Sequence, residues 1–137
     1  MSTLEHSVVS LLNLGSSIHH ANKESERRFG LSLVQWCLLK HLIDMPSASA
    51  RSLAKEAGVH PSTLTQTIKR LARKKLIFIL EDPKDSRRKL ISITRLGKDM
   101  MESTATQMTS WLSGLAALER DLDRISVSLN NSVSKQV

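Results

Sequence analysis

The chain has 137 residues, of which 40% are hydrophobic, and a formal net charge of +7 at pH 7. This length is usual for one domain with its own core. The longest unbroken apolar run, Leu76 to Leu80, is far shorter than the roughly 20 residues that span a membrane. Glu5 stands where a secretory signal carries positive charge, so we expect a soluble, cytoplasmic protein. The single cysteine, Cys37, excludes an internal disulfide framework and a multi-cysteine metal site.

The positive charge is concentrated in one third of the chain. Thirteen basic and four acidic residues lie between Arg51 and Lys98, a net charge of +9, and the rest of the chain carries −2. Such a concentration predicts a polyanionic partner, and duplex nucleic acid is favoured because no basic helix faces an aromatic-rich apolar side, as membrane binding would require. The four aromatic residues are too few to stack single-stranded bases. A solvated charged surface without a partner is the alternative.

Two amphipathic helices are predicted in the N-terminal third. Apolar residues recur every three or four positions from Leu4 to Ile18, and Gly30 ends the first helix because glycine tolerates a left-handed backbone. A helix of about 25 residues is longer than a small core requires, so part of it is expected to pack against another surface. The second helix begins near Leu33 and stops before Pro46, since the residue preceding proline disfavours the α conformation.

Two shorter helical patterns surround a glycine. Ser49 is predicted to cap the first and Gly58 to end it. The second starts at Pro61, whose missing amide costs nothing there, with His60 as a weak cap. Its outward and flanking side chains are hydroxyl, amide and basic groups, the types that read base edges and hold phosphates. These residues are Ser62, Thr63, Thr65, Gln66, Lys69, Arg70 and Arg73.

Two short apolar runs, Leu76 to Leu80 and Leu90 to Thr94, predict β-strands. The intervening sequence EDPKDSRRK has a turn signal at Asp82-Pro83 and predicts a hairpin with an extended basic loop. An ordinary hairpin does not need so many cations. A loop that follows a phosphate backbone into a narrow minor groove does.

Two further helices are predicted after Arg95, with a break near Gly114. Their stripes of Met, Trp and Leu are interpreted as packing surfaces rather than as a cofactor site. Together with the first helix, they leave apolar faces that the chain's own core does not require. These faces predict a shared dimer interface.

This order of elements, with the wing residues Asp85, Arg87 and Thr94, resembles the MarR family of winged helix-turn-helix transcription regulators over nearly the whole chain. The resemblance implies a mainly α fold of six helices with a small β-hairpin wing. It also implies one domain over residues 1–137, in which residues 32–95 bind DNA. Residues 1–30 and 96–137 would then form the dimerisation helices.

The resemblance further implies a homodimer that binds a pseudo-palindromic operator, usually as a repressor released by a small ligand or by oxidation. The side chains of Ser62, Thr63, Thr65 and Gln66 would enter the major groove. Arg87 would reach into the minor groove with Asp85 bracing it. The predicted wing contacts are Lys84, Asp85, Arg87 and Arg88. Gln66 departs from many family members, which have a basic residue there, and glutamine favours bidentate contact with adenine.

The sensor is less well defined by the sequence. A family-type effector pocket would lie between the first two helices and the start of the fifth, and its candidate residues are His19, His20, Trp36 and His41. The histidines lack metal-ligand spacing, so no metal or cofactor is expected. Cys37 could be a redox sensor, but only His41 stands near enough in sequence to activate it. A small apolar filler beside Trp36 is the favoured interpretation.

No enzyme is expected, because the sequence has no glycine-rich phosphate loop, paired carboxylates on a helix face, metalloprotease helix or nucleophile elbow. Two alternatives to a sequence-specific regulator remain open. One is an architectural, low-specificity DNA-binding protein that uses the same wing. The other is a protein-interaction module whose basic face binds an acidic partner.

Overall fold

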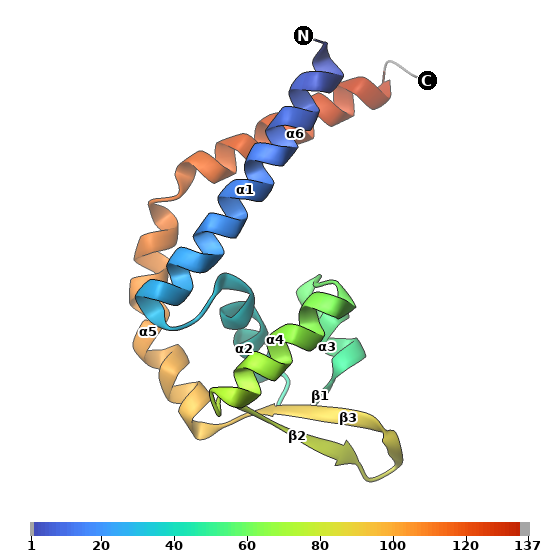
Figure 1. The fold of residues 1–137 in the computed structure, drawn as a ribbon, viewed down its shortest axis with the longest axis vertical. Coiled ribbons are helices and arrows are strands. Elements are labelled where there is room, and N and C mark those ends of the chain that lie inside the picture. The colour runs from blue at the N-terminus through green and yellow to red at the C-terminus, as the bar shows by residue number, and fades with distance from the viewer. Residues whose placement is uncertain (1, 135–137) are drawn as a thin grey trace.

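The structure is a computed structural model that describes residues 2–134, without the side chains of 116–119, 121, 122 and 132. Its elements confirm the predicted order of six helices and a hairpin (Figure 1). They are α1 (Thr3–Phe29), α2 (Leu33–Asp44), β1 (Ala48–Ser49), α3 (Ala50–Ala57), α4 (Pro61–Arg73), β2 (Ile77–Asp82), β3 (Asp85–Ile93), α5 (Arg95–Ser113) and α6 (Ala116–Ser134). Residues 135–137, the end of the predicted dimerisation segment, lie outside the described residues.

Local capping explains where the helices begin and end. Helix α1 ends at Gly30 with φ 76°, and α3 ends at Gly58 with φ 65°, both in the left-handed region that glycine adopts without strain. The Ser49 hydroxyl accepts a hydrogen bond from the Ser52 amide at 3.1 Å and so caps α3. All three predictions are confirmed.

Helices α1 and α6 pack along each other and extend away from the rest of the protein, with both ends of the chain at the far end of this pair (Figure 1). The buried residues of α1 are Ser7, Leu14, Ala21 and Ser25, and all of them except Leu14 are small. The hydroxyl oxygens of Ser7 and Ser128 lie 2.6 Å apart. Small residues such as Ser7 therefore allow α6 to approach α1 closely. Helix α5 connects this helix pair to the sheet.

The apolar stripe from Leu4 to Ile18 is a different face of α1. Leu4 is 64% exposed, Val8 47%, Leu11 44% and Ile18 47%. The stripe is therefore not part of the core of a single chain. This agrees with the expectation that part of the long helix packs against another surface.

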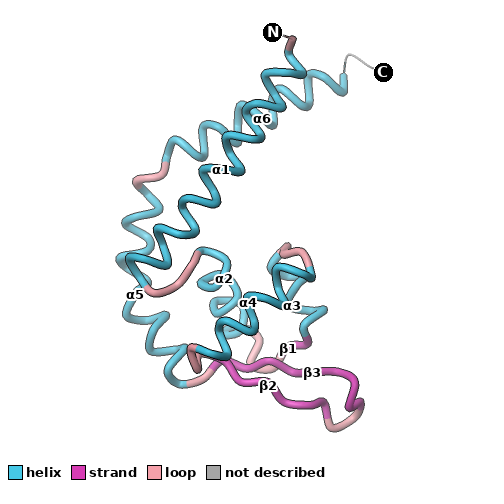
Figure 2. The backbone as a smooth tube through the Cα atoms, in the orientation of Figure 1, coloured by secondary structure: helices cyan, strands magenta, loops and turns pink. Residues whose placement is uncertain are grey.

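The three-stranded antiparallel sheet has the order β1-β3-β2 (Figure 2). The short strand β1 pairs Ala48 with Ile91 and was not predicted, because two residues carry no periodicity. The predicted basic loop was also wrong in extent, since β2 and β3 continue to Asp82 and Asp85 and only Pro83 and Lys84 lie between them. The hairpin projects away from the core and both of its faces are solvated, so this part of the strands needs no apolar residues.

The core beneath the hairpin joins α2, α3, α4 and the sheet. Leu38 and Leu39 of α2, Leu53 of α3, Leu71 of α4 and Ile91 of β3 are all almost completely buried. Close packing of side chains from these elements fixes the orientation of α4. Within the described residues, no helix is both long enough and apolar enough to cross a membrane.

Candidate nucleic-acid interface

Helix α4 is amphipathic in the way the sequence predicts. Leu64, Ile68 and Leu71 are buried against the core. The side chains on the opposite face and its flanks are exposed, and they include every residue predicted to contact DNA from this helix. These are Ser62, Thr63, Thr65, Gln66, Lys69, Arg70 and Arg73. The structure therefore places the seven side chains on the solvent side of one rigid helix.

The start of α4 is capped by a histidine. The Nδ1 atom of His60 accepts a hydrogen bond from the Ser62 amide at 3.2 Å and lies 2.8 Å from the Ser62 hydroxyl. Pro61 occupies the first helical position, as predicted. Thr65 donates its hydroxyl proton to the Pro61 carbonyl at 2.9 Å. The His60 side chain therefore pairs one of the free backbone amides of the first turn, although histidine is not one of the preferred cap residues.

On the wing, Asp85 holds Arg87. The Asp85 Oδ1 atom accepts hydrogen bonds from the Arg87 amide at 3.0 Å and from its Nε atom at 3.3 Å. The Arg87 side chain is nevertheless 91% exposed. An ion pair this exposed adds little to the stability of the fold. Its two hydrogen bonds instead orient the Arg87 guanidinium on the wing. Arg88 lies 3.9 Å from Asp82, and Lys84 is exposed at the turn.

An open groove of about 580 Å³ separates the wing from the start of α3. Asp85, Arg87 and Arg88 line its wing side, and Arg51 lines the opposite side. Sequence reasoning counted Arg51 only as part of the basic excess. Its position at this groove depends on the pairing of β1 with β3, for which the sequence has no signal.

Lys74 follows Arg73 as the C-cap of α4, and its side chain faces inward. Its Nζ atom donates hydrogen bonds to Glu26 Oε1 at 2.9 Å, to the Gly30 carbonyl at 2.9 Å and to Gln35 Oε1 at 2.8 Å. The hydrogen bond from Lys74 holds the pKa of the Glu26 carboxyl below its usual value. The Lys74 ammonium is therefore engaged by α1 and α2 and does not belong to the exposed basic face of α4.

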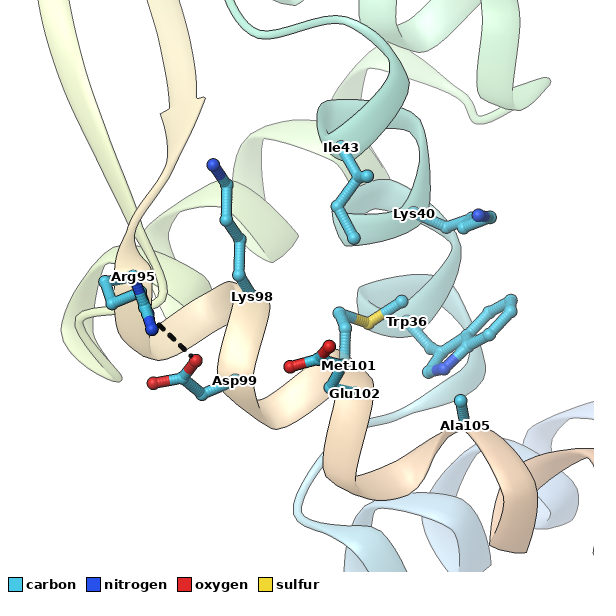
Figure 3. A pocket seen from close by; sticks show the side chains of 9 residues that line it. All are labelled: Trp36, Lys40, Ile43, Arg95, Lys98, Asp99, Met101, Glu102 and Ala105. Atoms are coloured by element: carbon cyan, nitrogen blue, oxygen red, sulfur yellow. Dashed lines mark hydrogen bonds and ion pairs between the residues drawn. The ribbon is translucent and has the colours of Figure 1, made fainter.

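A pocket of about 640 Å³ lies between α2 and α5 (Figure 3). Trp36, Lys40 and Ile43 line it from α2, and the α5 side is mainly charged, with Arg95 paired to Asp99. The Trp36 Nε1 atom is buried and has no hydrogen-bond partner among the described residues. This pocket adjoins α2 and the start of α5, as expected for an effector site, but the first helix, which was expected to border it as well, contributes none of the residues that line it.

The other predicted sensor residues are dispersed. His19 lines a separate polar groove between α1 and α4, and His20 and His41 line none of the pockets described here. No group of three possible metal ligands occurs among the described residues. Cys37 is half-buried, and burial raises the pKa of its thiol, which is opposite to the activation that redox sensors need.

Comparison with known proteins extends these observations. The sequence model of the MarR family matches residues 29–88. An uncharacterised HTH-type transcriptional regulator of Bacillus subtilis, YxaD, is 35% identical over 81 residues, which are 58% of this chain and 57% of that protein. The matched region thus spans little more than half the length of this curated relative.

Two solved structures share the fold over nearly their whole length. A MepR-like protein complexed with pseudoligands is 28% identical, with a TM-score of 0.68 and 97% of each chain covered. A mutant of MepR from S. aureus, bound to an oligodeoxyribonucleotide, is 19% identical, with a TM-score of 0.58 over 93% of this chain and 95% of that one. The family match, the regulator relative and the shared fold agree: this chain has a winged helix-turn-helix fold, and its residues 29–88 match the MarR family.

Proposed function

We propose that the protein is a ligand-responsive transcription regulator that binds a pseudo-palindromic operator in double-stranded DNA, and that it acts as a repressor in the cytoplasm. The observation that carries this proposal is the exposed face of α4 together with the Arg87 wing. One element offers hydroxyl, amide and basic groups for the major groove, and the other offers an oriented guanidinium for the minor groove. The DNA-bound MepR mutant shares this fold.

The protein acts as a homodimer in this proposal. The exposed stripe from Leu4 to Ile18 on α1 and the exposed residues Val127, Leu129 and Val133 on α6 leave large apolar surfaces uncovered in one chain. Surfaces of this kind mark protein–protein contacts. A two-fold axis along these helices would present two copies of α4 about 34 Å apart, the repeat of one turn of B-DNA.

The pocket between α2 and α5 is the proposed effector site. Trp36 and Ile43 give it an apolar wall on α2, and Arg95, Lys98 and Asp99 of α5 offer charged groups to a polar ligand. Helix α5 follows β3 directly, with only its N-cap Thr94 between them, so a ligand that moved α5 relative to α2 would also move the wing. The MepR-like protein of the same fold was solved with pseudoligands.

Selection of bound fragments from the organism's genome tests the DNA-binding proposal. We expect the recovered fragments to share an inverted repeat. Binding without a common repeat would instead identify an architectural DNA-binding protein. No binding to any duplex, even at low salt, would identify a protein-interaction module, because electrostatic binding to duplex DNA is strongest at low salt.

A further inference from the structure

Arg73, Lys74 and Lys75 form a basic cluster at the end of α4, which is called the reading helix because it is proposed to enter the major groove. The environment of Lys74 differs from that of its two neighbours. Arg73 and Lys75 are exposed, whereas the Lys74 side chain is 34% exposed and turned toward α1. A lysine ammonium has three N–H donors. All three have acceptors within 3 Å, in Glu26, Gly30 and Gln35. No donor is left for a phosphate.

The three acceptors lie where α1 ends and α2 begins. The Gly30 carbonyl is at the C-terminal end of α1, where a cation is favoured by the helix dipole. Gln35 is buried and belongs to the capping box of α2. Its side-chain Oε1 atom accepts a hydrogen bond from the Ser32 amide at 3.4 Å, and its backbone N–H donates one to the Ser32 hydroxyl oxygen at 3.1 Å. The ammonium therefore contacts the two helix ends at once.

Lys74 itself is the C-terminal cap of α4, and its amide donates to the Arg70 carbonyl at 3.1 Å. The backbone that carries the ammonium is thus the end of the reading helix. The Lys74 side chain links the end of α4 to the end of α1, the helix whose apolar stripe is the proposed dimer surface. In the proposed dimer, the angle between α1 and α4 would set the spacing of the two copies of α4.

We propose that Lys74 is a positioning residue for operator recognition, which holds α4 against α1 and α2 rather than contacting DNA. This inference rests on the proposed function. Removal of the ammonium would leave the buried amide of Gln35 short of a donor and would loosen the last turn of α4. The expected result is weaker binding to a correctly spaced operator without loss of a phosphate contact.

The salt dependence of binding separates these roles. Lys74→Met and Arg73→Met are compared by titration of the duplex recovered from the genomic selection, over a series of KCl concentrations. We expect both variants to lose about tenfold or more in affinity, but only Arg73→Met to lower the salt slope, by about one unit. A slope that falls equally in Lys74→Met, or an unchanged affinity, would overturn the proposal.

Substitution of Glu26, the carboxylate that pairs with Lys74, gives a second test, because the two possible roles of Lys74 predict opposite changes in DNA affinity. Glu26→Met removes an acceptor of Lys74, and Glu24→Met removes the same charge from the same helix, where Glu24 pairs with Arg27 and Arg28 instead. We expect Glu26→Met to weaken operator binding and Glu24→Met not to weaken it. If loss of Glu26 freed a lysine that binds phosphate, Glu26→Met would strengthen binding, and the proposal would be wrong.

Hydrogen exchange of the free protein supplies a readout that needs no DNA. In Lys74→Met we expect faster amide exchange in the last turn of α4 and at the start of α2, and unchanged exchange in these segments for Arg73→Met. Unchanged exchange in Lys74→Met would contradict the positioning role. A wild-type protein that binds no duplex would contradict the proposed function, and the exchange comparison would still decide the role of Lys74. If Lys74→Met does not fold, the comparison of Glu26→Met with Glu24→Met decides it.

Discussion

The hydroxyl of Thr94 donates a hydrogen bond to the carbonyl oxygen of Lys75 at 2.8 Å and accepts one from the Gly97 amide at 3.0 Å. Thr94 is the N-cap of α5, and Lys75 directly follows the C-cap of α4. One side chain therefore joins the end of the reading helix to the start of the helix that lines the proposed effector pocket. A displacement of α5 would be transmitted to α4 through this contact.

Lys75 adopts a left-handed backbone with φ 62°, the only such conformation outside glycine in residues 2–134. This conformation costs a residue with a Cβ about 1 to 2 kcal/mol. We expect Lys75→Gly to be more stable than Lys75→Ala by about 1 kcal/mol, because both lose the same charge and only glycine relieves the strain. Urea denaturation of the two variants measures the difference. Equal stability would show that the turn is not strained.

Gly97 lies against the hairpin so closely that a Cβ atom would meet the Leu76 carbonyl and come within 2.7 Å of Ile93 Cγ1. We expect Gly97→Ala to lower the free energy of unfolding by about 1 to 3 kcal/mol, because neither neighbour can move without disturbing the core. Ser103→Ala, on the exposed side of the same helix, is the control and should change stability little. A Gly97→Ala protein as stable as this control would refute the close contact.

Arg87→Ala removes the guanidinium that Asp85 orients on the wing. We expect weaker operator binding and a salt slope reduced by about one unit, because one groove or phosphate contact is lost. Arg124→Ala, which removes an exposed charge from α6, should leave the slope unchanged. Titrations at several salt concentrations make the comparison. If Arg87→Ala kept both the affinity and the slope of the wild type, the wing would not contact DNA.

Gln66→Ala tests direct reading of a base by α4. We expect the variant to lose preference at one position of each half-site, at a cost of about 1 to 3 kcal/mol, because a glutamine can pair with both adenine groups in the major groove. Affinities for a set of duplexes with single base changes measure this. A uniform loss on all of these sequences would mean that Gln66 contacts only the backbone.

Leu11→Asp places a charge in the exposed stripe of α1. We expect the protein to dissociate into monomers, because burial of an unpaired carboxylate at an apolar interface is unfavourable. Asn13→Asp, an equal charge change on an exposed residue of the same helix outside the stripe, should leave the dimer intact. Analytical ultracentrifugation distinguishes the two states. A dimeric Leu11→Asp would exclude this stripe from the interface.

Much of the fold could be predicted because its signals are local. Ser49, Gly58 and Pro61 mark helix ends by their own backbone and side-chain chemistry, and the period of the apolar residues identifies the inward face of α4. The seven residues on its outer face follow from the same period. The family resemblance singled out Asp85 and Arg87 as wing residues. The positive charge of the hairpin alone did not distinguish Arg87 from the basic residues beside it.

The features that were missed depend on contacts between distant segments. Lys74 and its partner Glu26 are 48 residues apart, and nothing near either residue distinguishes it from an ordinary surface charge. The length of the hairpin depends on strand pairing, which aligns Glu81 with Lys89 beyond the apolar runs. The effector candidates failed to converge because adjacent residues such as His19 and His20 point in different directions on a helix.

The central claim is that α4 enters the major groove while the Arg87 wing enters the adjacent minor groove. Hydroxyl-radical and methylation footprints of the wild-type protein on the selected operator test it most directly. We predict two protected major-groove segments with centres about 10 base pairs apart, each flanked by minor-groove protection that Arg87→Ala removes. A single continuous footprint that Arg87→Ala leaves unchanged would contradict the account.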